Sequence, residues 1–217
     1  MLEIILPRRR LLRAGLAATL PALVPAGVQG ADLLLTPTQT EGPFYPDELP
    51  RETDNDLVRI AGSEAQAVGQ VTHVLGRVLD RQGRPMPGTL VEIWQCDANG
   101  RYIAQVDRSW LGHQAREPGF QGYGRTLTDA GGGYRFRTIR PVAYSGRTPH
   151  IHVKLRRNGR ELLTTQMYVA GESGNTRDGI YGQLAPDERE RVTVALQPAP
   201  EIEGGALVGR FEIILAA

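Results

Sequence analysis

Short runs with high β-propensity recur along most of the chain and constrain its fold more than any other feature of the sequence. Each run is bounded by glycine, proline or aspartate, and the seven runs cover residues 72–80, 89–97, 134–141, 150–157, 161–169, 191–198 and 206–215. Several short strands separated by turns are typical of a β-sandwich. Because no stretch keeps a 3.6-residue apolar period beyond about three turns, we predict an all-β sandwich with few short helices.

Turn-forming residues separate these runs. Asn158-Gly159 predicts a tight hairpin, because both residues tolerate the positive φ that such a turn requires. Residues 129–133 and 82–85 combine aspartate, glycine and proline and predict two further turns.

The length and the charge balance limit the classes of function. A chain of 217 residues suits one compact domain. With 25 basic and 24 acidic residues, the formal net charge is +1, so nothing indicates a nucleic-acid partner. Cys96 is the single cysteine, which excludes an internal disulfide and a thiolate metal site, and we assign it no role.

The first 30 residues have the organisation of a signal peptide. Arg8, Arg9, Arg10 and Arg13 precede an alanine- and leucine-rich stretch that two prolines interrupt, and this arrangement resembles a twin-arginine export signal. The apolar stretch is shorter than the about 20 residues of a transmembrane helix. We therefore predict an exported, periplasmic or extracellular protein without stable membrane association, and the alternative is an uncleaved anchor or an amphipathic N-terminus.

The rest of the chain divides into two predicted parts. Residues 31–70 form an extended N-terminal segment, since the prolines after residue 35 are too closely spaced for a helix. Residues 71–217 then form the β-sandwich. We find no internal repeat.

Two histidines stand one residue apart at the start of a strand pattern. Alternate residues of a strand point to the same face, so the imidazoles of His150 and His152 face one way and could bind one metal ion. The pair alone is equally consistent with a structural or surface role. His73 and His113 have no such neighbour, and we interpret them as ordinary polar residues.

Two tyrosines extend this candidate metal site. Tyr102 follows the run 89–97, and Tyr144 lies six residues before His150. Two phenolates with two imidazoles would suit a hard trivalent ion, because anionic oxygen donors stabilise ferric over ferrous iron. Arginines 156 and 157 stand where a cupin would place a carboxylate ligand, which disfavours a ferrous site of that kind. Either tyrosine alone would be interpreted as a strand-edge aromatic.

Five segments with these residues resemble the intradiol ring-cleavage dioxygenases, of the protocatechuate 3,4-dioxygenase type. The segments are TPTQTEGPFYP (36–46), GRVLDRQGRPMPGTLVEIWQCDANGRY (76–102), FQGYGRTLTDAGGGYRFRTIRP (120–141), YSGRTPHIHVKL (144–155) and TTQMYV (164–169). The resemblance is weaker after residue 169.

The resemblance implies a non-haem Fe(3+) ion and a role for each motif residue. Its ligands would be Tyr102, Tyr144, His150 and His152. Arg147 would lie over the substrate ring with Gln166 beside it, and Tyr45 would contact the substrate. The ion would activate a catechol-type substrate for O2, which cleaves the ring between the two hydroxylated carbons and gives a muconate-type dicarboxylate in aromatic catabolism.

Two further points are left open by the resemblance. The segment between Tyr144 and His150 is much shorter than in protocatechuate dioxygenases and lacks their tryptophan, so the particular catechol is not defined. The resemblance also allows a homo-oligomer. The alternative interpretation is a non-catalytic transthyretin-like or carboxypeptidase-regulatory β-sandwich, in which the glycines and aspartates only make turns.

Overall fold

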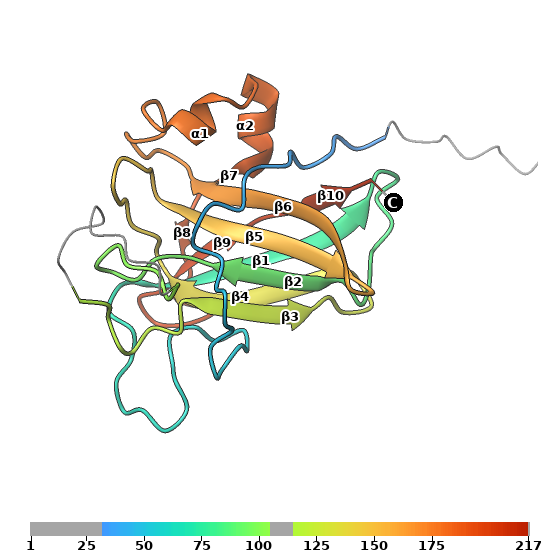
Figure 1. Ribbon diagram of the computed structural model, residues 1–217. Helices are drawn as coiled ribbons and strands as arrows, with labels where there is room; N and C mark the ends of the chain where they lie inside the picture. Colours follow the sequence, from blue (N-terminus) through green and yellow to red (C-terminus); the bar gives the residue numbers. More distant parts are fainter. Residues whose placement is uncertain (1–31, 105–114, 217) are drawn as a thin grey trace, which may run out of the picture. The chain divides into compact units, whose positions relative to one another are not determined.

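The computed structural model describes residues 32–104 and 115–216, which form two β-sheets and two short helices (Figure 1). The predicted all-β sandwich is confirmed. The predicted signal peptide and His113 lie outside the described residues, and the division between residues 31–70 and 71–217 stays a prediction. The elements are β1 (Val71–Asp80), β2 (Leu90–Trp94), β3 (Tyr123–Leu127), β4 (Gly133–Ile139), β5 (His150–Arg157), β6 (Arg160–Val169), α1 (Gly179–Gly182), α2 (Pro186–Val192), β7 (Thr193–Val194), β8 (Gln197–Pro198), β9 (Leu207–Arg210) and β10 (Ile213–Leu215).

Each sheet has five strands. The first has the order β10-β1-β9-β8, with β4 paired to β1 in antiparallel orientation. The second has the order β3-β2-β5-β6-β7 and is antiparallel apart from the β6–β7 pair. In the second sheet β5 is the middle strand, with β2 and β6 on either side, so its residues are held by neighbours along both edges.

Alternate residues of the strands form the main hydrophobic core. Val74 and Phe136 contribute from the first sheet and Val91, Ile151 and Val153 from the second, and each is at most 2% exposed. Because strand residues alternate between faces, the neighbours of Ile151 on β5 point to the opposite side of the second sheet.

That opposite side is covered by residues 36–46, and from this point the name N-terminal segment refers only to these residues. Figure 1 shows this part of the chain crossing β6, β5 and β2. The Gln39 N–H donates to the Thr164 carbonyl at 2.8 Å, and the Gln166 amide donates to the Thr40 carbonyl at 3.0 Å. The first six residues of β5 are therefore buried on both faces, which places His150 and His152 between a sheet and a covering segment.

The turns follow their sequence signals. Asn158 and Gly159 have φ values of 52° and 77° and connect β5 to β6 in a hairpin, as predicted. Gly83 closes the turn after β1 with φ 75°, and residues 129–133 connect β3 to β4 through a hydrogen bond between Asp129 N–H and the Gly133 carbonyl.

Two strand predictions need correction, and one strand was not predicted. Residues 191–198 do not form one strand, because α2 begins at Pro186 with a capping contact from Glu188 and continues through Val192. Residues 206–215 are split into β9 and β10. Residues 123–127, which were predicted only as part of a motif, form β3.

The split between β9 and β10 coincides with a close approach at Gly76. A Cβ on Gly76 would lie only 1.9 Å from the Phe211 carbonyl oxygen, which accepts a hydrogen bond from the Tyr134 hydroxyl at 2.6 Å. The regular pairing with β1 is interrupted here and resumes three residues further along β1. Among the described residues, no helix has the length and apolar character needed to cross a membrane.

Candidate functional site

Four side chains meet on the covered face of the second sheet, and we call them the Tyr–His cluster: Tyr102, Tyr144, His150 and His152. The two histidines lie on β5, Tyr102 follows β2, and Tyr144 precedes β5. All four are buried, with exposures between 1% and 9%. The structure thus brings together all four residues that the sequence proposed as metal ligands.

The two tyrosine-bearing loops pack against each other at a glycine. Gly100 has φ 74°, and a Cβ there would lie 3.1 Å from the Tyr144 Cβ. A larger residue would push the loops apart. Because Gly100 permits this approach, the Tyr102 and Tyr144 rings stand at 5.2 Å in an edge-to-face arrangement.

Potential ligand atoms of the Tyr–His cluster lie within a few ångströms of each other. His150 Nε2 is 3.3 Å from His152 Nε2 and 3.5 Å from the Tyr102 hydroxyl. His150 Nδ1 lies 2.6 Å from the Thr148 carbonyl oxygen. A carbonyl can only accept, so Nδ1 carries the hydrogen and Nε2 presents its lone pair to the cluster.

Burial keeps both imidazoles neutral. It lowers the pKa of His150 to about 3, with the Arg147 charge acting in the same direction. Burial also lowers the pKa of His152 well below its ordinary value, and the neighbouring His150 adds to this effect. Neutral imidazoles are the form that ligates a metal.

Burial has the opposite consequence for the tyrosines. It raises the pKa of Tyr102 well above the usual value, and it raises the pKa of Tyr144 less, because hydrogen bonding to Tyr102 and the Arg147 charge oppose it. Without a cation the phenols therefore stay protonated. A bound metal ion would have to displace these protons.

This donor set fits a ferric ion. The described residues contain no group of three or more His, Cys, Asp or Glu side chains able to hold a metal, so a metal at the Tyr–His cluster would depend on phenol oxygens. Two phenolates and two imidazoles supply hard anionic donors together with nitrogen donors, a combination that suits a trivalent ion.

Aromatic side chains stack on two members of the Tyr–His cluster. The Trp94 ring stacks on His152 with centroids 4.8 Å apart and planes 11° apart. Phe44 of the N-terminal segment stacks on Tyr102 at 4.4 Å and 3°. Stacking from both sides of the cluster restricts the orientation of these rings, as the neighbours of metal ligands commonly do.

Arg147 and Gln166, which the sequence analysis proposed as site residues, lie together beside the cluster. Arg147 Nη2 donates to Gln166 Oε1 at 2.6 Å. The same oxygen accepts from the Tyr168 hydroxyl at 3.1 Å, and the Gln166 amide nitrogen donates to Thr40. Gln166 is thus engaged by three protein partners and fixes the arginine.

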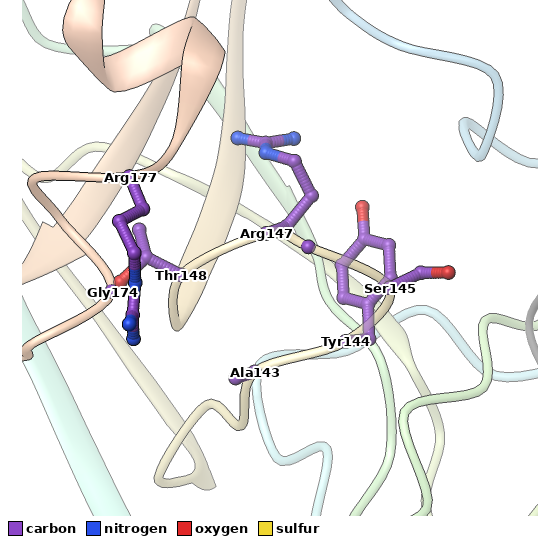
Figure 2. A pocket seen from close by; sticks show the side chains of 8 residues that line it. Ala143, Tyr144, Ser145, Arg147, Thr148, Gly174 and Arg177 are labelled. Carbon is purple, nitrogen blue, oxygen red and sulfur yellow. The ribbon is translucent and has the colours of Figure 1, made fainter.

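A cavity of about 500 Å³ adjoins the cluster on the Tyr144 side. It is lined by residues 143–148 together with Gly174 and Arg177. In Figure 2 the Tyr144 and Arg147 side chains extend to the same side of their loop, whereas Arg177 extends in the opposite direction. Of the four cluster residues, Tyr144 is the one that lines this cavity.

The structure places Tyr45 and Cys96 away from this cavity. The Tyr45 hydroxyl donates to Glu92 at 3.0 Å, and its ring meets the edge of Trp94 at 5.1 Å, so its role as a substrate contact stays a prediction. Cys96 is 1% exposed and packs in the same aromatic cluster as Tyr102 and Tyr144.

The sequence interpretation missed one polar residue of the site, Asp178. Its carboxylate accepts from Arg147 Nε at 2.8 Å and caps α1. An aspartate directly before a short helical stretch is an N-cap signal, but nothing local connects it with an arginine 31 positions earlier. Phe44, which stacks on Tyr102, lies in the TPTQTEGPFYP motif, and the sequence analysis assigned it no role of its own.

Comparison with known proteins agrees with this geometry. The family model described as "Dioxygenase" matches residues 40–188. The chain is 38% identical over 183 residues to a protocatechuate 3,4-dioxygenase beta chain from Burkholderia cepacia, covering 80% of this chain and 76% of the relative. It is 30% identical to a hydroxyquinol 1,2-dioxygenase from Nocardioides simplex, where the match covers 81% of this chain but 62% of the relative's length.

Solved structures give the same result. The dioxygenase domain of a dioxygenase and carbohydrate-binding protein fusion from Streptomyces sp. SirexAA-E is 32% identical, with a TM-score of 0.65 over 84% of this chain and 99% of that one. Catechol 1,2-dioxygenase from Acinetobacter sp. ADP1 is 27% identical, with a TM-score of 0.60 over 83% of this chain and 62% of that one. The matched family and the relatives together show that this chain belongs to the intradiol ring-cleavage dioxygenases, a family known to use non-haem iron.

Proposed function

We propose that the protein is a non-haem Fe(3+) dioxygenase that cleaves a catechol-type substrate between its two hydroxylated carbons with O2. The observation that carries the proposal is the Tyr–His cluster itself, in which two neutral imidazoles and two phenols are buried together beside Arg147. A non-catalytic sandwich would give these four side chains no reason to converge in one buried place.

The Tyr–His cluster would hold the iron through two phenolate oxygens and two imidazole nitrogens. When bound, a ferric ion supplies Lewis-acid activation of a catechol and a template for it. The remaining steps concern the chain's own groups. Tyr144 lines the cavity, and in its phenolate form it would accept a proton from a catechol hydroxyl.

Arg147 would stabilise negative charge on the substrate. Its guanidinium is hydrogen-bonded to Asp178 and Gln166, and the Arg147 side chain is 16% exposed. A preorganised cation in a partly buried site lowers the energy of charge that develops during the reaction, an effect worth a few kcal/mol at comparable sites. Gln166 supports this placement through the bond it accepts from Arg147.

The substrate class follows from the relatives' names, which include protocatechuate, catechol and hydroxyquinol dioxygenases. We propose a catechol-type aromatic as the substrate and a muconate-type dicarboxylate as the product. The short segment between Tyr144 and His150 forms the cavity wall here, so we expect the substituents accepted on the ring to depend on residues 143–148. Homo-oligomerisation stays a prediction.

Aerobic turnover of a panel of catechols tests the reaction. Purified protein loaded with iron should consume O2 and catechol in equal amounts and release a diacid that mass spectrometry identifies. Release of a yellow semialdehyde would show cleavage outside the two hydroxylated carbons and would overturn the proposal. A colourless protein that stays inert after ferrous loading and reoxidation would do the same.

We further propose that residues 1–30 direct export by the twin-arginine route. The supporting observation is the arginine cluster before an apolar stretch. Replacing Arg9 and Arg10 by lysine should retain the protein in the cytoplasmic fraction, while the unmodified chain is found outside it. Equal distribution of the two chains would contradict this route.

A further inference from the structure

The carboxylate of Asp178 lies directly behind Arg147 and has no exposed side-chain surface. Each of its oxygens accepts two hydrogen bonds. Oδ1 accepts from the backbone N–H groups of Ile180 and Tyr181, at 2.9 and 3.0 Å. Oδ2 accepts from Arg147 Nε at 2.8 Å and from the Thr148 N–H at 2.9 Å.

Three of these four donors are backbone groups, so the carboxylate is fixed independently of Arg147. Two belong to the first turn of α1, which Asp178 caps. The third is at Thr148, two residues before His150. Asp178 thereby connects α1 to the loop that leads into β5. Its carboxylate is held in one position by these backbone hydrogen bonds.

Arg147 needs such an anchor. It ends a tight turn in which Ser145 and Gly146 have φ values of 38° and 82°, and backbone hydrogen bonds between Tyr144 and Arg147 close that turn. The turn fixes the arginine backbone but leaves its long side chain free to rotate. An arginine side chain has many rotamers, so ordering it has an entropic cost.

Two contacts restrict that rotation. Gln166 Oε1 accepts a hydrogen bond from Nη2, and Asp178 Oδ2 accepts one from Nε, so the guanidinium is held at two of its three nitrogens. The buried negative charge also compensates the arginine charge, which makes burial of the cation tolerable.

We propose that Asp178 is a positioning residue, which fixes the Arg147 guanidinium at the edge of the Tyr–His cluster in the orientation that ring cleavage requires. This inference rests on the proposed function, because the role of Arg147 in the reaction belongs to that function. Asp178 itself does not line the cavity and acts only through the arginine.

Replacing Asp178 by asparagine separates its two tasks. Asparagine is as good an N-cap as aspartate, so its amide oxygen can keep the bonds to Ile180 and Tyr181. Its NH2 group then faces the N–H donors of Arg147 and Thr148, where no hydrogen bond can form. The variant should fold and lose its hold on Arg147.

The expected result for Asp178→Asn is a kcat per bound iron reduced about 10- to 100-fold, with KM changed less than about threefold. Iron content and the visible tyrosinate band should stay at wild-type values. The decisive measurement is a double-mutant cycle. In an Arg147→Ala background, Asp178→Asn should change kcat less than about threefold, because the group it positions is already gone.

Asp187→Asn is the matched control, since it removes a carboxylate at the start of the other helix, where Asp187 pairs with Arg191. It should leave kcat and KM unchanged. Asp178→Ser, which also retains an N-cap oxygen, replaces Asp178→Asn if the asparagine variant does not fold. A crystal structure of the folded variant should show Arg147 displaced from its wild-type position.

The outcomes separate this inference from the function it rests on. If wild-type protein turns over catechol but Asp178→Asn has wild-type kcat, or if the effects of Asp178→Asn and Arg147→Ala simply add, the positioning role is wrong and the function stands. If wild-type protein binds no iron and cleaves no catechol, the proposed function fails, and the positioning role fails with it.

Discussion

Tyr102 and Tyr134 both have a buried hydroxyl, and the two hydroxyls have different partners. Tyr102 meets His150 in the Tyr–His cluster, whereas Tyr134 donates to a backbone carbonyl at the break between β9 and β10. We expect Tyr102→Phe to abolish iron retention and the visible band, because one anionic ligand is lost. Absorption spectra and iron analysis of the purified variant measure both.

Tyr134→Phe is the control for the loss of a buried hydroxyl. It should lower the free energy of unfolding by about 1–3 kcal/mol, since the Phe211 carbonyl loses its partner, and leave iron and colour unchanged. Unchanged colour in Tyr102→Phe would remove that tyrosine from the metal site.

Cys96 is buried among the aromatic residues of the site, and burial raises the pKa of its thiol to about 12. At pH 8 the thiol is therefore protonated and shielded. We expect native protein not to react with a disulfide reagent at this pH, and one equivalent to react after unfolding in urea. Rapid reaction of the native state would show that the packing around Tyr102 opens.

Glu203 lies away from the site, and we expect it to contribute to the acid sensitivity of the fold. Hydrogen bonds from Arg137, followed by its charge and His73, lower the pKa of Glu203 to about 2. A carboxyl with a lowered pKa stabilises the folded state above its ordinary pKa, and this contribution is lost as the pH falls. Stability should therefore decrease between about pH 5 and pH 2.

Glu203→Gln should flatten that decrease and lower stability at pH 7 by roughly 1 kcal/mol, since the pair with Arg137 is partly exposed. Urea unfolding at several pH values measures this. Glu212→Gln, which breaks the exposed pair with Arg77, should have little effect. Identical acid dependence in Glu203→Gln and wild type would contradict the assignment.

At the scale of elements, alternate residues of β5 serve different purposes: one face packs in the hydrophobic core and the other contributes to the Tyr–His cluster. Ile151 is 0% exposed in the core, and its neighbours His150 and His152 face the other side. We expect Ile151→Val to lower the free energy of unfolding by about 0.5–1.5 kcal/mol without changing the visible band. The exposed Ile202→Val should stay within about 0.5 kcal/mol. An altered band in Ile151→Val would show that the two faces are coupled.

The alternation of β5 could be predicted from the sequence because a strand has a fixed period of two. The hairpin at Asn158-Gly159 could also be predicted, since both residues permit positive φ. The division of residues 206–215 could not be predicted, because it accompanies the close approach of the Phe211 carbonyl to Gly76. A local pattern contains no information about which distant backbone approaches a glycine.

At the scale of the molecule, a metal that binds only the folded state should stabilise it. The cluster joins the loop after β2, the loop before β5, and β5 itself, so unfolding would separate its members. We expect iron removal by a chelator to lower the melting temperature by several degrees, measured by calorimetry. His150→Ala, which lacks one ligand, should melt at the same temperature with or without chelator. An unchanged wild-type melting temperature would indicate that no metal is bound at the cluster.

The sequence by itself determined the β-sandwich, the shared face of His150 and His152, and the set of tyrosines that completes the cluster, because strand period and motif are local properties. The tertiary structure decided what surrounds that cluster. Phe44 reaches Tyr102 from the N-terminal segment, and Asp178 reaches Arg147 from the cap of α1. Such contacts join residues 31 to 58 positions apart along the chain, and only the packing of residues 36–46 and the start of α1 around the cluster brings them together.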